Sequence, residues 1–168
     1  MIVPAMMLAQ AAIASTPALG TVEGRCRPGQ SGPALLVDVT GLKDRAGVLR
    51  AEIYPERDGD FLADDNTLVS QGKVFRRVVA ALPSSGPVQL CIRVPAAGTY
   101  ALAVVHARTG KRGFSLLKDG IGFGANPRLG YAKPKAASAA VVVRAVPTPT
   151  TVIMNYRSGL FSFGPLRR

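Results

Sequence analysis

Short runs of alternating apolar and polar side chains are the feature that most constrains the fold of this 168-residue chain. Successive side chains of a β-strand point to opposite faces, so period-two alternation indicates strands that bury one face. No stretch has a sustained 3.6-residue apolar repeat with caps, and helix is expected at most as short turns, around residues 62–69. Seven runs are typical of strands: residues 34–40, 48–54, 74–82, 88–94, 99–106, 138–146 and 151–157.

These runs predict an all-β fold, a seven-stranded two-sheet sandwich of immunoglobulin-like or transthyretin-like kind. Proline and glycine at residues 83–87, 95–98 and 147–149 separate runs, because they favour turn dihedrals and interrupt the pairing of strands. The chain has room for one domain with a sizeable core. The predicted organisation is a signal peptide at 1–20, a lead-in at 21–33, the β-sandwich domain at 34–157 and a C-terminal tail at 158–168.

Both ends of the chain have a distinctive composition. The first 20 residues carry no charged side chain and are apolar up to Ile13, which predicts a secretory signal whose mature chain begins near residues 15–21. The alternative is an apolar strand or short helix packed on the domain; Pro4 and a run shorter than about 20 residues disfavour a membrane anchor. The tail is apolar and then basic, and it either rests on a membrane surface, covers an edge strand or frays.

The two cysteines bear on the compartment. Export would place the protein in the periplasm or outside the cell, where disulfides form and persist. Cys91 is out of phase with the apolar residues Leu90 and Ile92, so its side chain should face away from the core, and Cys26 lies just before the first predicted strand. A disulfide between Cys26 and Cys91 is therefore predicted, with two unrelated free thiols as the alternative.

Charge is distributed unevenly along the chain. Residues 1–100 hold ten Lys/Arg and nine Asp/Glu, whereas residues 101–168 hold eleven Lys/Arg and one acid, Asp119. Such asymmetry indicates an anionic partner, and outside the cytoplasm the candidates are acidic lipid head groups, phosphorylated glycans or acidic polymer. A basic proteome that tolerates surface arginine is the competing interpretation.

Residues 107–137 are predicted to form one long loop, with six glycines and seven Lys/Arg. Loops longer than about 12–15 residues are uncommon unless they are functional or mobile. Cations attract phosphate or carboxylate, and aromatic rings stack on sugars or sit at a lipid interface. The alternative is a solvated loop whose aromatic rings pack on the sandwich. The candidate ligand-binding residues are Arg108, Lys111, Arg112, Lys118, Arg128, Tyr131, Lys133 and Lys135.

Catalytic and metal-binding patterns are weak. His106 is the only histidine and no Gly-x-Ser-x-Gly elbow occurs, so we expect His106 to be hydrogen-bonded to backbone in an adjoining turn. One histidine and two cysteines 65 positions apart do not give zinc-ligand spacing. We expect no catalytic residue, metal or cofactor.

One cluster of oxygen ligands occurs between the second and third runs. Its spacing does not match a calcium-binding EF-hand loop. The cluster is either a solvated acidic turn or a surface that pairs with the basic loop of a neighbouring molecule. Its members are Asp58, Asp60, Asp64, Asp65 and Asn66.

Three segments, residues 47–62, 88–114 and 119–126, resemble a bacterial exported family catalogued as domain of unknown function 2141. The most specific mark is Pro95-x-x-Gly98-Thr99-Tyr100-Ala101, before a strand that ends in His106. The resemblance spans about residues 34–157 and implies a secreted or periplasmic β-sandwich of unestablished role.

The chain departs from this family directly after His106. Typical members continue with Asp-x-Asn-x-Asn, an oxygen-rich run similar to a calcium loop. Here the residues are Ala107, Arg108 and Thr109, and hard divalent cations need several anionic or carbonyl oxygens. A metal site of the family is therefore expected to be absent at this loop.

The resulting hypothesis is a non-enzymatic cell-envelope domain that binds an anionic glycan or lipid through residues 107–137, with peripheral membrane contact. Export disfavours nucleic acid as a partner. The alternative is a structural or accessory module for protein–protein contacts in the periplasm. An enzyme is a third and weaker hypothesis.

Overall fold

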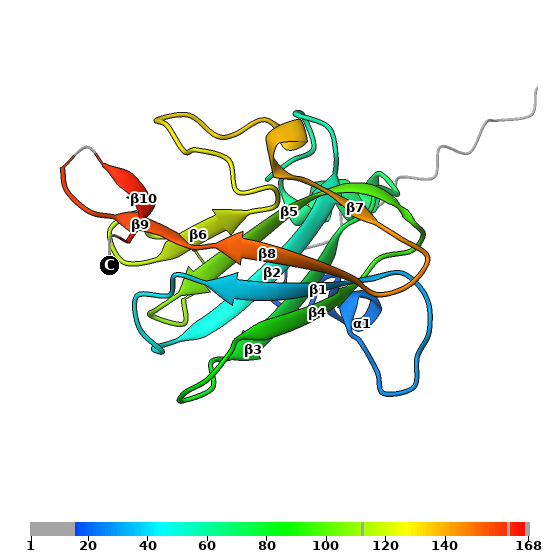
Figure 1. Cartoon of the computed structure of the whole chain (residues 1–168). Helices are drawn as coiled ribbons and strands as arrows, with labels where there is room; N and C mark the ends of the chain where they lie inside the picture. Colours follow the sequence, from blue (N-terminus) through cyan, green and yellow to red (C-terminus); the bar gives the residue numbers. More distant parts are fainter. Residues whose placement is uncertain (1–15, 112, 161, 167–168) are drawn as a thin grey trace, which may run out of the picture.

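The computed structural model describes residues 16–111, 113–160 and 162–166, which form two β-sheets with few helical turns (Figure 1). This architecture confirms the all-β, two-sheet prediction. The elements in chain order are α1 (Thr21–Gly24), β1 (Ala34–Thr40), β2 (Val48–Pro55), α2 (Asp65–Ser70), β3 (Arg76–Ala81), β4 (Gln89–Arg93), β5 (Gly98–Ala107), β6 (Gly120–Phe123), the 3₁₀ turn η1 (Ala136–Ala139), β7 (Ala140–Val143), β8 (Thr148–Ile153), β9 (Asn155–Arg157) and β10 (Phe163–Pro165).

Sheet A has the strand order β4-β1-β8, and sheet B has the order β10-β9-β6-β5-β2-β3, with β7 also paired to β5. The long strand β5 organises sheet B. Its residues 100–107 pair antiparallel with β2 along one edge. Its other edge is shared: β7 pairs with residues 98–101 and β6 with residues 103–106. The end of β5 therefore lies beside the starts of β2 and β6.

The prediction of seven strands is wrong, because the described residues form ten. The single run predicted at 151–157 is two strands, β8 in sheet A and β9 in sheet B, and the buried Met154 lies between them. The single loop predicted at 107–137 is interrupted by β6 and η1. Part of the predicted tail forms β10, which pairs with β9 and so covers its edge, as one of the three interpretations of the tail expected.

Sheet B is covered on both faces. Alternate residues of its strands, such as Leu49 and Ile53 of β2, lie in the core between the two sheets. The residues between them face outward, where Tyr54 and Phe123 pack in a second core with Phe61 and Phe75. Their rings meet edge to face at centroid distances of 5.4–5.7 Å, a favoured aromatic geometry. Residues 56–75 and 124–139 thus cover the outer face.

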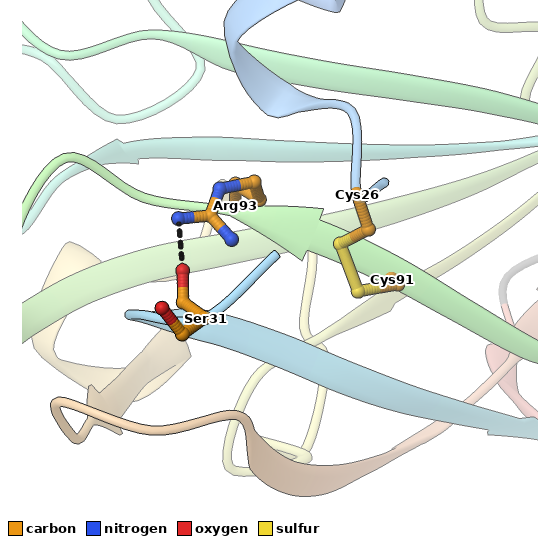
Figure 2. The surroundings of a disulfide bond; sticks show 4 residues. All are labelled: Cys26, Ser31, Cys91 and Arg93. Carbon is orange, nitrogen blue, oxygen red and sulfur yellow. Dashed lines mark hydrogen bonds between the residues drawn. A yellow bond between two sulfur atoms is a disulfide. The ribbon is translucent and has the colours of Figure 1, made fainter. Parts of the chain in front are cut away.

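The predicted disulfide is confirmed, since Cys26 is bonded to Cys91 of β4 (Figure 2). The residue before Cys26, Arg25, forms a β-bridge to Ile92. Further along the lead-in, the carbonyl oxygen of Ser31 accepts a hydrogen bond of 2.9 Å from Arg93 Nη2. The lead-in is thereby attached to sheet A.

Residues 16–24 pack on β3. The carbonyl oxygen of Gly20 accepts a 3.1 Å hydrogen bond from the backbone N–H of Arg77. Gly20 has φ +74°, and a Cβ there would meet the carbonyl oxygen of Phe75 at 3.1 Å, so glycine suits this contact. Residues 1–15, most of the predicted signal peptide, lie outside the described residues. Within the described chain, no helix has the length and apolarity needed to cross a membrane.

Candidate functional site

His106 lies at the end of β5 and is fully buried. Its Nε2 lies 2.7 Å from the carbonyl oxygen of Ala46, to which it donates, and its Nδ1 lies 2.6 Å from the hydroxyl of Tyr156. Burial lowers the pKa of His106, so the imidazole is neutral and Nδ1 accepts from that hydroxyl. Burial likewise raises the pKa of Tyr156 to about 12. The expected backbone contact of His106 is confirmed, and both ring nitrogens have structural partners.

The β1–β2 loop, residues 41–47, is held against the end of β5. Arg108 donates to Asp44 Oδ2 from Nε at 2.8 Å and also from Nη2. The Arg108 guanidinium holds the pKa of Asp44 below its usual range, mainly through these hydrogen bonds. Gly47 has φ +73°, and a Cβ there would collide with backbone of Ala107 and Arg108. Arg108, one of the predicted ligand residues, is therefore already paired within the domain.

Asp119 closes the β5–β6 loop, which comprises residues 108–119. Its carboxylate is buried, with the residue 2% exposed. Oδ1 accepts from the backbone N–H of Arg108 at 3.0 Å, and Oδ2 accepts from that of Ser115 at 2.8 Å. Asp119 is the only acid among residues 101–168. That part of the chain therefore offers no acidic side chain to an anionic partner.

The tip of the β5–β6 loop combines cations with exposed apolar side chains. Phe114, Leu116 and Leu117 are 40%, 54% and 68% exposed. Lys111 and Lys118 flank them, are exposed, and have no ion-pair partner among the described residues. Another predicted site residue of this loop, Arg112, lies outside the described residues.

The sequence analysis did not single out Leu116 and Leu117. Two adjacent leucines outside any alternating run, between Gly113 and Lys118, are the signal that could have found them. Large apolar side chains in a segment of turn composition have no strand face to occupy, and exposure is the expected result.

The remaining predicted residues lie in a different place. They belong to the outer-face segment, residues 124–139, which β6 separates from the β5–β6 loop. Arg128 and Tyr131 line an open cavity of about 630 Å³ between this segment and the β9–β10 hairpin. Lys133 Nζ donates to the carbonyl oxygens of Asp58 at 3.0 Å and of Phe61 at 2.7 Å. Lys135 is exposed just before η1. The structure thus divides the seven predicted residues that it describes between two surfaces.

The acidic segment, residues 58–66, is only in part a solvated turn, the first of its two interpretations: Asp58 and Asp64 are exposed, whereas Asp60 and Asp65 are buried. Asp58 Oδ1 accepts from the backbone N–H of Ala136 at 2.7 Å, so the acidic segment pairs with the outer-face segment of the same molecule. Asp60 is buried and forms an ion pair of 2.6 Å with Lys73. Asp64 caps α2 by accepting from two backbone N–H groups, those of Asn66 and Thr67.

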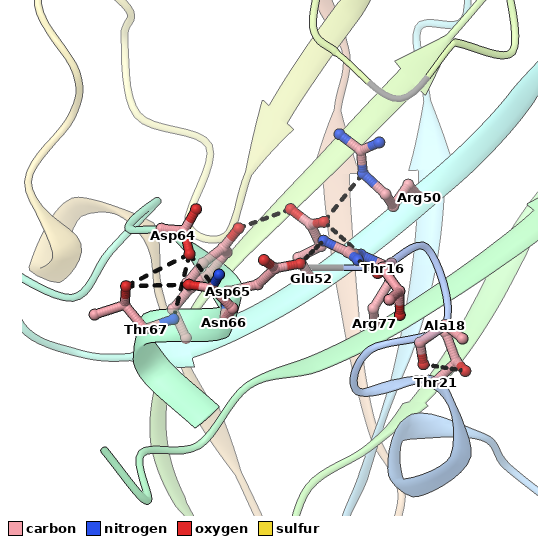
Figure 3. A network of polar contacts seen from close by, with 11 residues as sticks. Thr16, Ala18, Thr21, Arg50, Glu52, Asp64, Asp65, Asn66, Thr67 and Arg77 are labelled. Atoms are coloured by element: carbon pink, nitrogen blue, oxygen red, sulfur yellow. Dashed lines mark hydrogen bonds and ion pairs between the residues drawn. The ribbon is translucent and has the colours of Figure 1, made fainter. Parts of the chain in front are cut away.

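Asp65 joins a buried charged cluster on the outer face of sheet B (Figure 3). Arg77 donates to Glu52 at 2.8 Å and to Asp65 at 2.9 Å, and Arg50 Nε lies 3.0 Å from Glu52. The hydroxyl of Tyr54 donates to Glu52 at 2.7 Å, and burial raises the pKa of Tyr54. The acids are neutralised by arginine, and the described residues include no group of three or more His, Cys, Asp or Glu arranged to hold a metal ion.

The comparisons with known proteins identify a family and give no activity. The sequence model of a family described as "uncharacterized protein conserved in bacteria (DUF2141)" matches residues 37–151. No curated protein and no solved structure matches the chain. The matched segment runs from β1 to β8 and includes His106 and the β5–β6 loop. The chain therefore belongs to the DUF2141 family.

Proposed function

We propose that this protein is an exported, non-enzymatic domain that binds an anionic glycan or lipid of the cell envelope. The observation that carries the proposal is the burial of Asp119, the only acid among residues 101–168. Its carboxylate is used by backbone N–H groups, so Lys111 and Lys118 stand on the loop tip without a neighbouring acid of the same segment. An excess of cations at one end attracts an anionic surface.

Two further features support the proposal. The Cys26–Cys91 disulfide suits an oxidising compartment and therefore export to the periplasm or outside the cell. His106 is fully buried and its ring nitrogens are hydrogen-bonded to Ala46 and Tyr156, so a substrate cannot reach the ring, which supports a non-enzymatic role. We also propose that the two-sheet sandwich is of immunoglobulin-like or transthyretin-like kind.

The test is binding to a soluble polyanion, inorganic polyphosphate, at about 20 mM and about 500 mM NaCl. Charge-driven binding should fall steeply with salt, since the screening length shrinks severalfold over this range. Lys111→Gln/Lys118→Gln should weaken binding at low salt. The matched control is Arg27→Gln/Arg144→Gln, which removes two exposed cations that do not belong to the β5–β6 loop. Equal binding by both double variants would contradict the proposal.

A further inference from the structure

The β5–β6 loop carries both charge and apolar surface, and this combination identifies a class of ligand. We infer that the loop docks on a lipid bilayer with anionic head groups. In this arrangement Phe114, Leu116 and Leu117 enter the boundary between head groups and acyl chains, while Lys111 and Lys118 contact the head groups. The inference rests on the proposed function, because it names the anionic partner of the same loop.

The apolar side chains distinguish a bilayer from a soluble polyanion or a glycan. Three large apolar residues within four positions are 40–68% exposed at one loop tip. Exposed apolar surface in water is unfavourable in proportion to its area, and a polyanion has no apolar phase that could remove it. A bilayer offers such a phase directly beneath its charged layer, so apolar burial and cation attraction act together.

The backbone of the loop is suited to enter this boundary. The carbonyl oxygen of Ser115 accepts from the N–H groups of Lys118 at 3.1 Å and Asp119 at 2.8 Å, which forms a tight turn around Leu116 and Leu117. The carboxylate of Asp119 accepts the N–H groups of Ser115 and Arg108. Polar backbone groups that already have partners cost less to remove from water. The turn also fixes the two leucines on the outside of the domain, so little order has to be gained on docking.

A second apolar point lies at the same end of the molecule. β9 runs antiparallel to β6, and Asn155 at its start pairs with Ile121. β9 therefore continues past Gly120, the first residue of β6, toward the β5–β6 loop. The β9–β10 hairpin lies at that end in Figure 1, and its tip residue Leu160 is 79% exposed. Arg157 donates to the carbonyl oxygens of Gly159 and Leu160 and so shapes this tip.

The charge of this end suits anionic lipid. The β1–β2 loop adds the exposed Lys43, and its acid, Asp44, is paired with Arg108. The acid of the β5–β6 loop itself, Asp119, is buried. Basic side chains next to exposed apolar residues therefore meet no competing acid from the β1–β2 loop or from the β5–β6 loop.

The first experiment measures co-sedimentation of the full chain with vesicles of phosphatidylcholine, with or without about 30 mol% phosphatidylglycerol, a lipid fraction chosen to give a clear negative surface potential. The protein should bind the anionic vesicles at low salt. Leu116→Ser/Leu117→Ser should lower vesicle affinity about tenfold or more, because it removes apolar area that docking buries, and should leave polyphosphate binding unchanged. The matched control, Val142→Ser/Val146→Ser, removes two equally exposed apolar residues outside the loop and should bind as the parent does.

These outcomes separate the two proposals. If Leu116→Ser/Leu117→Ser binds vesicles as the parent does, lipid docking is wrong while anion binding by the lysines stands. If the parent protein binds neither vesicles nor polyphosphate at low salt, both are wrong.

A spectroscopic readout gives an independent test. The sequence contains no tryptophan, so Leu117→Trp introduces a single indole at the loop tip. Its fluorescence should shift to the blue with anionic vesicles and be quenched by lipids labelled in the acyl chain, but not shift with polyphosphate. Val142→Trp is the control and should not respond. An unshifted Leu117→Trp spectrum with bound vesicles would overturn the insertion.

Discussion

His106 illustrates how one residue connects three parts of the fold. Its ring joins β5 to the β1–β2 loop through Ala46 and to β9 through Tyr156. The side chain is on the inner face of β5, at the point where the space between the sheets ends. A neutral imidazole satisfies both partners, as a donor at Nε2 and an acceptor at Nδ1. Its role is to close the core at the end that carries the β5–β6 loop.

The pKa of His106 should be measurable directly, because it is the only histidine of the untagged chain. Burial lowers this pKa from the ordinary value of 6.5, so as the pH falls the imidazole is protonated at a higher pH in the unfolded chain than in the folded one. The stability that His106 confers is therefore present above pH 6.5 and is lost as the pH falls from 6.5 through the lowered pKa. Proton NMR of the ring should give a midpoint below 6.5, and denaturant unfolding should show lower stability at pH 5 than at pH 7.5.

Asp44 acts in a separate pH window. Its pKa is lowered from 3.8 by Arg108, so the stability that Asp44 confers is fully present above pH 3.8 and is lost only in stronger acid.

For His106, an imidazole midpoint at or above 6.5 in the proton NMR titration would contradict the buried neutral state.

Arg77 is the second residue whose environment leads to a prediction. It is ion-paired to the buried acids Glu52 and Asp65 and also donates to the carbonyl oxygen of Thr16 at 3.1 Å. Arg77→Met should lower the free energy of unfolding by about 3–5 kcal/mol, because it removes a partner from two buried carboxylates. Arg57→Met, at an exposed position, should change it by no more than about 0.5 kcal/mol. Urea unfolding compares the two, and similar losses would show that the cluster is not a stabilising unit.

At the scale of elements, β6 shows why a strand can be missed when strands are predicted from alternating apolar and polar residues. Its sequence Gly-Ile-Gly-Phe has two glycines, which are poor strand formers and suggest a loop. The structure requires them: the ring of Tyr156 packs against Gly120, and the crossover from β8 to β9 packs against Gly122. Two elements distant in the sequence thus make glycine favourable in a strand.

Gly122→Ala tests this account. A Cβ at residue 122 would collide with a methyl group of Val152 and lie 2.8 Å from the carbonyl oxygen of Ile153. Overpacking of this kind costs about 1–3 kcal/mol, so the thermal midpoint should fall by several degrees. Gly59→Ala adds a methyl group where nothing lies within 4 Å and is the control. Equal midpoints for Gly122→Ala and the parent would mean that β8 and β9 do not cross tightly over β6.

For the whole molecule, the disulfide closes a loop of 65 residues from the lead-in to sheet A. Cys26→Ser/Cys91→Ser should lower the free energy of unfolding by about 4 kcal/mol in the chain-entropy description of cross-links. Denaturant unfolding with and without reductant measures this effect. Reductant should destabilise the parent to the same extent and leave the double variant unchanged. A parent protein insensitive to reductant would show that the bond does not contribute.

The same scale explains which parts of the fold were predictable. The runs at β1, β2 and β5 combine alternation with proline and glycine at their ends, and they were found close to their true bounds. The run at 151–157 carries no break in its sequence, yet it changes sheets at Met154, whose N–H donates to the carbonyl oxygen of Thr40 at 2.9 Å. Which sheet a residue joins depends on partners distant in the chain, and no local pattern encodes them.

The candidate site also has features that the sequence predicted and features that it could not. The sequence alone determined that residues 101–168 carry a large excess of cations and that the chain alternates as a two-sheet β protein must. Only the tertiary structure decided that Asp119 is buried, that Arg108 and Lys133 are engaged within the domain, and that Leu116 and Leu117 remain exposed beside Lys118. The physical reason is that composition and periodicity are local properties of a chain. Burial and pairing depend on segments brought together from far apart.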